Sequence, residues 1–80
     1  MYIYKIFESK TPEIEGIIYD SFGIAVYIEN GNTLIEIAAV PDVFLLREQA
    51  KAFVDKCNSV NLSPLDLMDK IEAWIKLYQK

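Results

Sequence analysis

The chain offers few residues that could do catalytic chemistry. It contains no histidine, which removes the usual general base and metal ligand, and its only cysteine is Cys57. Cys57 falls near the C-terminus of an expected helix, where the helix dipole disfavours a thiolate, so we interpret it as a structural residue. A lone cysteine cannot form a cysteine-rich zinc site, and the three glycines form no phosphate-binding loop. We therefore expect no metal and no cofactor.

Paired carboxylates are the remaining enzymatic signal. Glu29 and Glu36 share one face of an expected hairpin, and Asp66, Asp69 and Glu72 recur at helical spacing. Glycosidase-like chemistry needs one carboxyl group in an apolar pocket that raises its pKa. A solvated helix face provides no such pocket, and acids near a helix N-terminus complement the helix dipole instead. We therefore expect a protein that is not an enzyme and has no catalytic residues.

The composition indicates a single small domain, residues 1–80. Hydrophobic residues make up 52% of the chain, which is more apolar material than a monomer of 80 residues buries easily. We therefore expect a homo-oligomer, with a homodimer as its simplest form. A single cysteine excludes an internal disulfide, no segment is long enough to span a membrane, and the first residues lack a signal-peptide layout. These features predict a cytoplasmic protein that does not associate with membranes.

The negative charge is unevenly distributed. The formal net charge is −4, and six acids and two lysines within residues 1–40 account for all of it. Residues 41–80 carry equal numbers of acidic and basic side chains. Binding to nucleic acid is not expected, because phosphate contacts need clustered lysine and arginine. An acidic surface of this kind fits a protein partner with a basic surface.

The first half of the chain has the pattern of a β-meander. Residues 24–37 predict a hairpin with Asn30 and Gly31 in its turn, since this dipeptide is the strongest two-residue turn signal. Residues 1–8 and 14–19 are expected to be strands, and residues 20–23 a turn, which gives three to four strands within residues 1–40. The hairpin register places five apolar side chains on one buried face: Ile24, Val26, Ile28, Ile35 and Ile37.

The second half, residues 41–80, changes to the helical period. Asp42 is expected to cap a first helix that Asn58 closes in the left-handed conformation, and Ser63 to cap a second helix that begins at Pro64. We expect this helical hairpin to pack on the isoleucine face, giving a small α+β domain with an antiparallel N-terminal sheet. The expected buried stripes are Leu46, Ala50, Phe53, Val54 and Cys57 in the first helix, and Leu67, Ile71, Trp74, Ile75 and Tyr78 in the second.

Five short motifs lie along these expected elements. They are Phe22-Gly-Ile24, Ile35-Glu-Ile37, Cys57-Asn58, Leu62-Ser-Pro-Leu65 and Asp69-Lys-Ile-Glu72. Together they resemble an uncharacterised family of short bacterial proteins over residues 22–75, with Phe22 where that family usually has tyrosine. The resemblance implies the same order of strands and helices, and it carries no known activity.

The outer face of the expected sheet is too apolar for a lone domain. An apolar patch with an aromatic anchor and a polar rim is typical of a protein interface. The alternative is that the first strand or a helix covers this face. The candidate interface residues are Ile18, Ala25, Tyr27 and Leu34, with Glu29 and Glu36 at the rim.

These features predict a small acidic protein-interaction module. We expect it to bind and modulate a larger protein, in the manner of inhibitors of host defence encoded by phages or mobile elements, and to act as a homo-oligomer. The alternative is an oligomer that binds or sequesters a small molecule in a pocket between protomers, lined by tyrosines and backbone amides. The scarcity of basic residues in the first half disfavours phosphate-bearing ligands and ranks the interaction module first.

Overall fold

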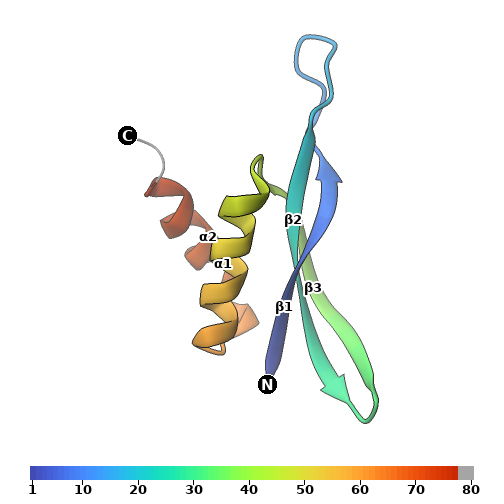
Figure 1. The fold of residues 1–80 in the computed structure, drawn as a ribbon, viewed down its shortest axis with the longest axis vertical. Coiled ribbons are helices and arrows are strands. Elements are labelled where there is room, and N and C mark those ends of the chain that lie inside the picture. Colours follow the sequence, from blue (N-terminus) through green and yellow to red (C-terminus); the bar gives the residue numbers. More distant parts are fainter. Residues whose placement is uncertain (78–80) are drawn as a thin grey trace.

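The computed structural model describes residues 1–77 and contains a three-stranded antiparallel sheet followed by helices (Figure 1). The strand order is β1-β2-β3, so β1 and β3 are the two edges of the sheet. The expected small α+β fold is therefore confirmed. Tyr78, which was expected in the second helical stripe, lies outside the described residues. The elements are β1 (Tyr2–Lys10), β2 (Asp20–Asn30), β3 (Thr33–Phe44), α1 (Arg47–Ser59), a short 3₁₀ helix η1 (Pro64–Asp66) and α2 (Leu67–Lys76).

The hairpin between β2 and β3 turns one residue later than predicted. Its loop is formed by Gly31 and Asn32, and Gly31 adopts the left-handed φ of 65° that favours glycine. Asn30, which was expected in the turn, is the last residue of β2 and pairs with Thr33. Further along, a β-bulge leaves Ile37 as an extra residue in β3. The predicted alternation of the hairpin therefore holds only as far as this bulge.

The strand β3 continues through the segment that was expected to start the first helix. Asp42 is not a helix cap: it lies in β3 with a left-handed φ of 52°, and its backbone N–H donates a hydrogen bond to Ser9 Oγ at 3.1 Å. Pro41 can occupy this strand because an edge strand has backbone positions that need no N–H donor. The helix α1 begins at Arg47, and Leu46 before it is 57% exposed instead of buried in the core.

The helical hairpin turns at a different asparagine from the one predicted. Asn61, with a φ of 48°, adopts the left-handed conformation, whereas Asn58 is still within α1. Ser63 does cap the following helical segment, because its Oγ accepts a hydrogen bond from the backbone N–H of Leu65 at 3.3 Å. The first turn after this cap is 3₁₀ in geometry, and α2 begins at Leu67. Within residues 1–77 no helix is long and apolar enough to cross a membrane.

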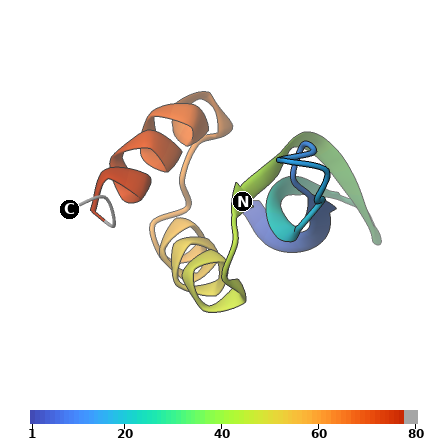
Figure 2. The same ribbon diagram turned by 90° about the horizontal axis from the view of Figure 1, so that it is seen from above.

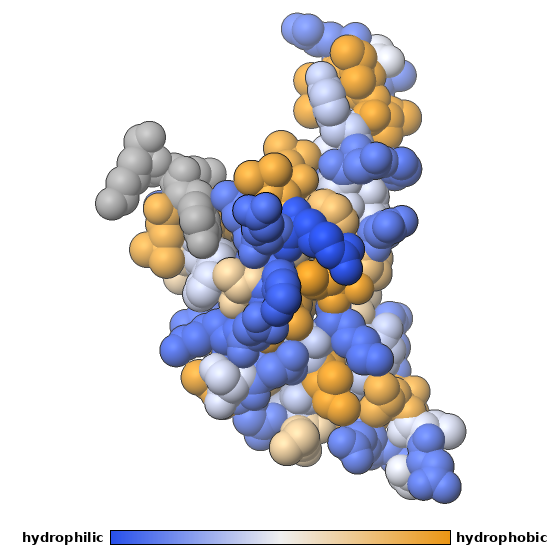
Figure 3. All heavy atoms as spheres, in the orientation of Figure 1, coloured by the Kyte–Doolittle hydropathy of each residue, from blue (hydrophilic) through white to orange (hydrophobic). Residues whose placement is uncertain are grey.

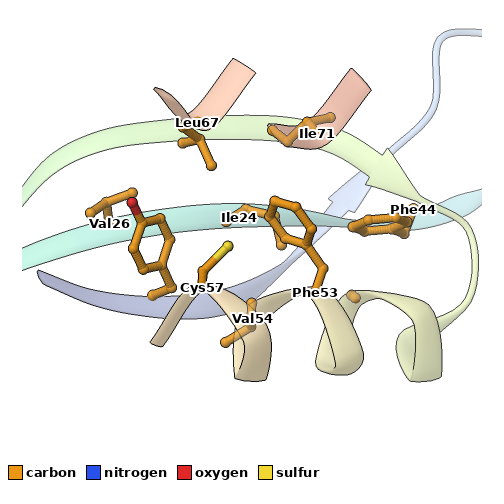
Figure 4. Close-up of a cluster of buried hydrophobic side chains, with 10 residues drawn as sticks. Ile24, Val26, Phe44, Phe53, Val54, Cys57, Leu67 and Ile71 are labelled. Atoms are coloured by element: carbon orange, nitrogen blue, oxygen red, sulfur yellow. The ribbon is translucent and has the colours of Figure 1, made fainter. Parts of the chain in front are cut away.

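The hydrophobic core lies between the helices and one face of the sheet (Figure 2). Side chains from β2, β3, α1 and α2 gather around Phe53 (Figure 4). The ring centroid of Phe53 lies 5.6 Å from that of Phe44 and 5.6 Å from that of Trp74. Trp74 and Ile75 are half-buried and pack against this cluster. The buried members are Tyr4, Ile24, Val26, Phe44, Ala50, Phe53, Val54, Cys57, Leu67 and Ile71.

The helices cover only the middle of the sheet, which changes the expected core. Ile35 and Ile37 are 41% and 43% exposed, so placing them in the core was wrong, and Ile28 is half-buried. The end of the β2–β3 hairpin extends past the helices, and the opposite end of the sheet extends past them as well (Figure 1). The molecule is accordingly elongated, with extents of 46 × 26 × 20 Å.

Candidate interaction surfaces

Residues 11–19 form a hairpin that projects from the sheet, which we call the arm. It continues the two-stranded ribbon beyond Lys10 and Asp20, the last paired residues of β1 and β2, whose side chains form a salt bridge. At its base the backbone N–H of Thr11 donates to the carbonyl of Tyr19 at 2.9 Å, and the N–H of Tyr19 donates to Thr11 Oγ1 at 3.0 Å. The arm is therefore a folded extension of the sheet.

The tip of the arm is a tight two-residue turn. Ile14 and Ile17 exchange backbone hydrogen bonds of 2.8 and 3.0 Å around Glu15 and Gly16. Both central residues are left-handed, with φ of 50° and 79°, as a type I′ turn requires. The expected strand over residues 14–19 and the expected turn over residues 20–23 are therefore both wrong, because the turn is at residues 15–16 and β2 begins at Asp20. The Glu-Gly pair between two isoleucines was the available signal for the turn.

Apolar side chains on the arm are well exposed. Ile14, Ile17, Ile18 and Tyr19 each keep between 48% and 58% of their surface accessible. Hydrophobic side chains gather on the arm at the top of the space-filling view (Figure 3). The arm also carries two carboxylates, and residues 11–19 contain no lysine or arginine. The arm therefore combines an apolar surface with uncompensated negative charge.

The predicted interface residues are divided between two places. Tyr27, Glu29, Leu34 and Glu36 do lie together, because Tyr27 pairs with Glu36 and Glu29 with Leu34. The Tyr27 hydroxyl donates to Glu36 Oε1 at 3.5 Å, and Lys5 Nζ lies 5.6 Å from the Tyr27 ring centroid. We call these four residues the distal face. It is a polar and aromatic surface in which Leu34, 41% exposed, is the aliphatic member.

The other two predicted residues do not join the distal face. Ala25 shares its side of the sheet but is only 1% exposed, so it cannot take part in an interface. Its small side chain lies between its cross-strand neighbours Lys5 and Ala39. Ile18 belongs to the arm, nine residues before Tyr27 and thus about 30 Å away along an extended strand. Including Ala25 and Ile18 in one patch was therefore wrong.

The outer face of the sheet is not covered by the helices, which pack on the opposite side (Figure 2). The first strand does not cover it either, because β1 pairs edge to edge with β2. One aromatic ring does lie over it: a Cβ atom placed on Gly23 would be 2.4 Å from Phe7 Cζ and 2.7 Å from the carbonyl oxygen of Val40. Phe7 therefore packs directly over the Gly23 backbone, where only glycine fits.

The free edge of β1 is closed by asparagine side chains from the helical half. Asn58 Oδ1 accepts a hydrogen bond from the backbone N–H of Tyr4 at 2.8 Å, and its Nδ2 donates to the Tyr4 carbonyl at 3.1 Å. Asn61 Oδ1 accepts from the N–H of Tyr2 at 2.9 Å. The Tyr4 hydroxyl donates to the carbonyl of Leu62 at 2.6 Å. We call these contacts the asparagine clasp, and they prevent another strand from pairing with this part of β1.

Cys57, which the sequence predicts to be a structural residue, lies in the core. It is fully buried, and burial raises the pKa of its thiol to about 11. Burial likewise raises the pKa of Tyr4 to about 12, with a smaller contribution from electrostatic repulsion by Cys57. Both groups are therefore held in their neutral forms at physiological pH. Among residues 1–77, no three histidine, cysteine or acidic side chains are grouped so that they could hold a metal ion.

A hollow of about 460 Å³ lies at the base of the arm. Two of its charged lining residues, Lys10 and Asp20, are paired with each other. The hydroxyl of Ser21 is buried and has no hydrogen-bond partner in the described part of the chain. The lining residues are Glu8, Ser9, Lys10, Asp20, Ser21 and Phe22.

Comparison with family models, with curated proteins and with solved structures finds no match to this chain. The resemblance inferred from the short sequence motifs therefore stays a prediction.

Proposed function

We propose that the protein is an interaction module that binds a larger protein through the parts of its sheet that the helices leave uncovered. The arm is the main contact in this proposal, and the distal face is a second one. The observation that carries the proposal is the position of Ile14, Ile17, Ile18 and Tyr19 on a folded hairpin outside the core. Four half-exposed apolar side chains of this size stabilise a complex by about 1 kcal/mol each when they are covered.

The arm is folded before it meets a partner, which supports its use in binding. Its backbone hydrogen bonds and its type I′ turn hold the apolar side chains in place. A preformed element loses less conformational entropy on binding than a flexible loop does. A module of this kind inhibits its partner by covering a surface that the partner needs for its own activity. An origin in a phage or mobile element and a cytoplasmic location stay predictions.

Binding of a small molecule is the second candidate function, and the hollow at the base of the arm favours it. The unpartnered Ser21 hydroxyl is a polar group that a ligand could satisfy. The pairing of Lys10 with Asp20 leaves no free base there to hold an anionic ligand, however, and Glu8 adds a negative charge to the lining. This hollow is also formed within one chain, whereas the sequence predicted a pocket between protomers. We therefore rank this function second.

The test compares the wild-type protein with an arm variant and a matched control. The arm variant carries Ile14→Ser and Ile18→Ser, and the control carries the same kind of change at Leu65 and Leu77, which are 93% and 63% exposed in the helical half. Each tagged protein is used to capture partners from the source cells. We expect one partner to be retained by wild type and control and lost by the arm variant. Equal capture by all three proteins would contradict the proposal.

Light scattering behind a sizing column, at several protein concentrations and in high salt, tests the expected homo-oligomer. A dimer that the arm variant disrupts would mean that the arm binds a second copy. A monomer would mean that the arm is free for a different protein.

A further inference from the structure

We infer that the arm binds in an apolar cleft of the larger protein, and that lysine or arginine side chains surround this cleft. This inference rests on the proposed function and adds the chemistry of the partner surface. It follows from three observations: the arrangement of the apolar side chains on the arm, the charges beside them, and the surfaces that a second copy of the chain could offer.

The arrangement of side chains indicates a cleft. Ile14 and Ile17 are cross-strand neighbours and lie on the same face of the ribbon. Ile18 directly follows Ile17, and consecutive side chains of a chain outside a helix point in different directions. All three remain at least half exposed, which shows that neither face is packed against the body of the protein. A flat surface could cover only one face of this ribbon, whereas a cleft covers both.

The charges on the arm indicate a basic rim. Glu13 and Glu15 lie beside the apolar side chains, and both are exposed. The nearest lysine in the sequence, Lys10, already forms a salt bridge with Asp20. The carboxylates of Glu13 and Glu15 therefore have no compensating base on the arm itself. Basic side chains around the cleft would complement them, speed association and reject acidic surfaces.

A second copy of the chain is a poor fit for this site. Two arms meeting face to face would bring four carboxylates together, which costs free energy. The hollow at the base of the arm contains the acids Glu8 and Asp20 and is not an apolar cleft. Residues 41–80 carry six lysine and arginine side chains and six acids, so the helical half of a second copy offers no net positive charge. Within it, Lys51 is paired with Asp55. A different protein with a basic rim is therefore the occupant that we infer.

The experiment uses site-specific photocrosslinking in the full chain, expressed in the source cells. p-Benzoylphenylalanine replaces Ile18 in the arm, Leu34 in the distal face, or Leu65 in the helical half as a control. We expect Ile18 replacement to give an adduct with a larger protein and Leu65 replacement to give none. Peptide mapping should then place the crosslink in an apolar cleft flanked by lysine or arginine side chains.

Charge reversal separates the basic rim from general electrostatic attraction. Glu13→Lys combined with Glu15→Lys is expected to lower the adduct yield from position 18 about tenfold. The matched control, Glu48→Lys with Glu72→Lys, makes the same change in net charge on the helices and should leave the yield nearly unchanged. Equal losses for both pairs would overturn the inference.

The remaining outcomes distinguish the inference from the proposed function. An adduct with twice the mass of the chain would show that the arm binds a second copy, and this would overturn the inference. So would a crosslink mapped to a flat or acidic surface. An adduct from Leu34 but not from Ile18 would reject the inference while the interaction module stood. No adduct from either position would reject both.

Discussion

Replacing Asn58 with alanine tests how much of the stability depends on the asparagine clasp. The Asn58 amide is the hydrogen-bond partner of both the N–H and the carbonyl of Tyr4, at 2.8 and 3.1 Å. Alanine removes both partners and leaves two partly buried backbone groups beside a side chain that cannot bond to them. The helix itself would not be weakened, because alanine has a higher helix propensity than asparagine.

The expected loss of folding stability follows from these two hydrogen bonds. Each contributes about 1 kcal/mol net, and a buried group left without a partner costs about 1–3 kcal/mol. Alanine recovers about half a kcal/mol through its helix propensity. We therefore expect Asn58→Ala to lower the free energy of unfolding by about 2–3 kcal/mol, out of roughly 4–12 kcal/mol expected for a domain of this size. The melting temperature should fall by about 10–20 °C.

The assay is urea unfolding followed by the fluorescence of Trp74, the only tryptophan in the chain. Its indole packs edge-on against Phe53 in the core, so its emission reports on the core directly. Ser59→Ala is the matched control, because it removes one exposed hydrogen bond, from Ser59 Oγ to the Lys56 carbonyl, at the same end of α1. Asn58→Asp should be as damaging as Asn58→Ala at neutral pH, since it presents only acceptor oxygens to the Tyr4 carbonyl. A loss for Asn58→Ala within about 0.5 kcal/mol of the control would show that these two hydrogen bonds do not stabilise the fold.

Three further predictions concern packing, titration and the arm. Gly23→Ala should cost about 1–3 kcal/mol in urea unfolding, because the new methyl group would meet the Phe7 ring, and part of that cost should disappear in a Phe7→Ala background. Stability should fall as the pH rises from about 9 towards 12, because the unfolded chain releases the Cys57 and Tyr4 protons before the folded protein does. In unfolding curves measured across this range, Cys57→Ala should reduce the loss of stability at the lower end of the pH range. An unchanged dependence of stability on pH would show that Cys57 does not cause this loss. Ile18→Ser should change the free energy of unfolding by less than about 0.5 kcal/mol in a thermal melt, and a larger loss would show that the arm supports the fold.

The fold class could be predicted because the patterns that define it are local. The helical stripe that includes Phe53 and Cys57 and the cap at Ser63 each depend on residues only a few positions apart. The continuation of β3 past Pro41 could not be found in this way, because proline suits both the first turn of a helix and an edge strand. The β-bulge at Ile37 left no local signal that the hairpin pattern would be interrupted.

The candidate site was harder to predict than the fold, for two physical reasons. Gly16 lies in the segment that was expected to be a strand, although with Glu15 it forms the turn at the tip of the arm. Exposure also depends on where the helices end, and the sequence pattern does not contain that information. Ile14 and Ile35 have the apolar side chains expected of a buried strand. Both are nevertheless exposed, because the helices do not extend far enough to cover them.

The asparagine clasp has a consequence for the order of events during synthesis. Tyr4 is translated 54 residues before Asn58, and Tyr2 is translated 59 residues before Asn61. While the ribosome makes the intervening residues, the helices do not yet cover the apolar face of β1 and β2. The free edge of β1 also lacks the asparagine side chains that bond to it. A nascent chain at this stage resembles the exposed intermediates that chaperones bind. Stable tertiary structure is therefore expected to form only after the helical half has left the exit tunnel.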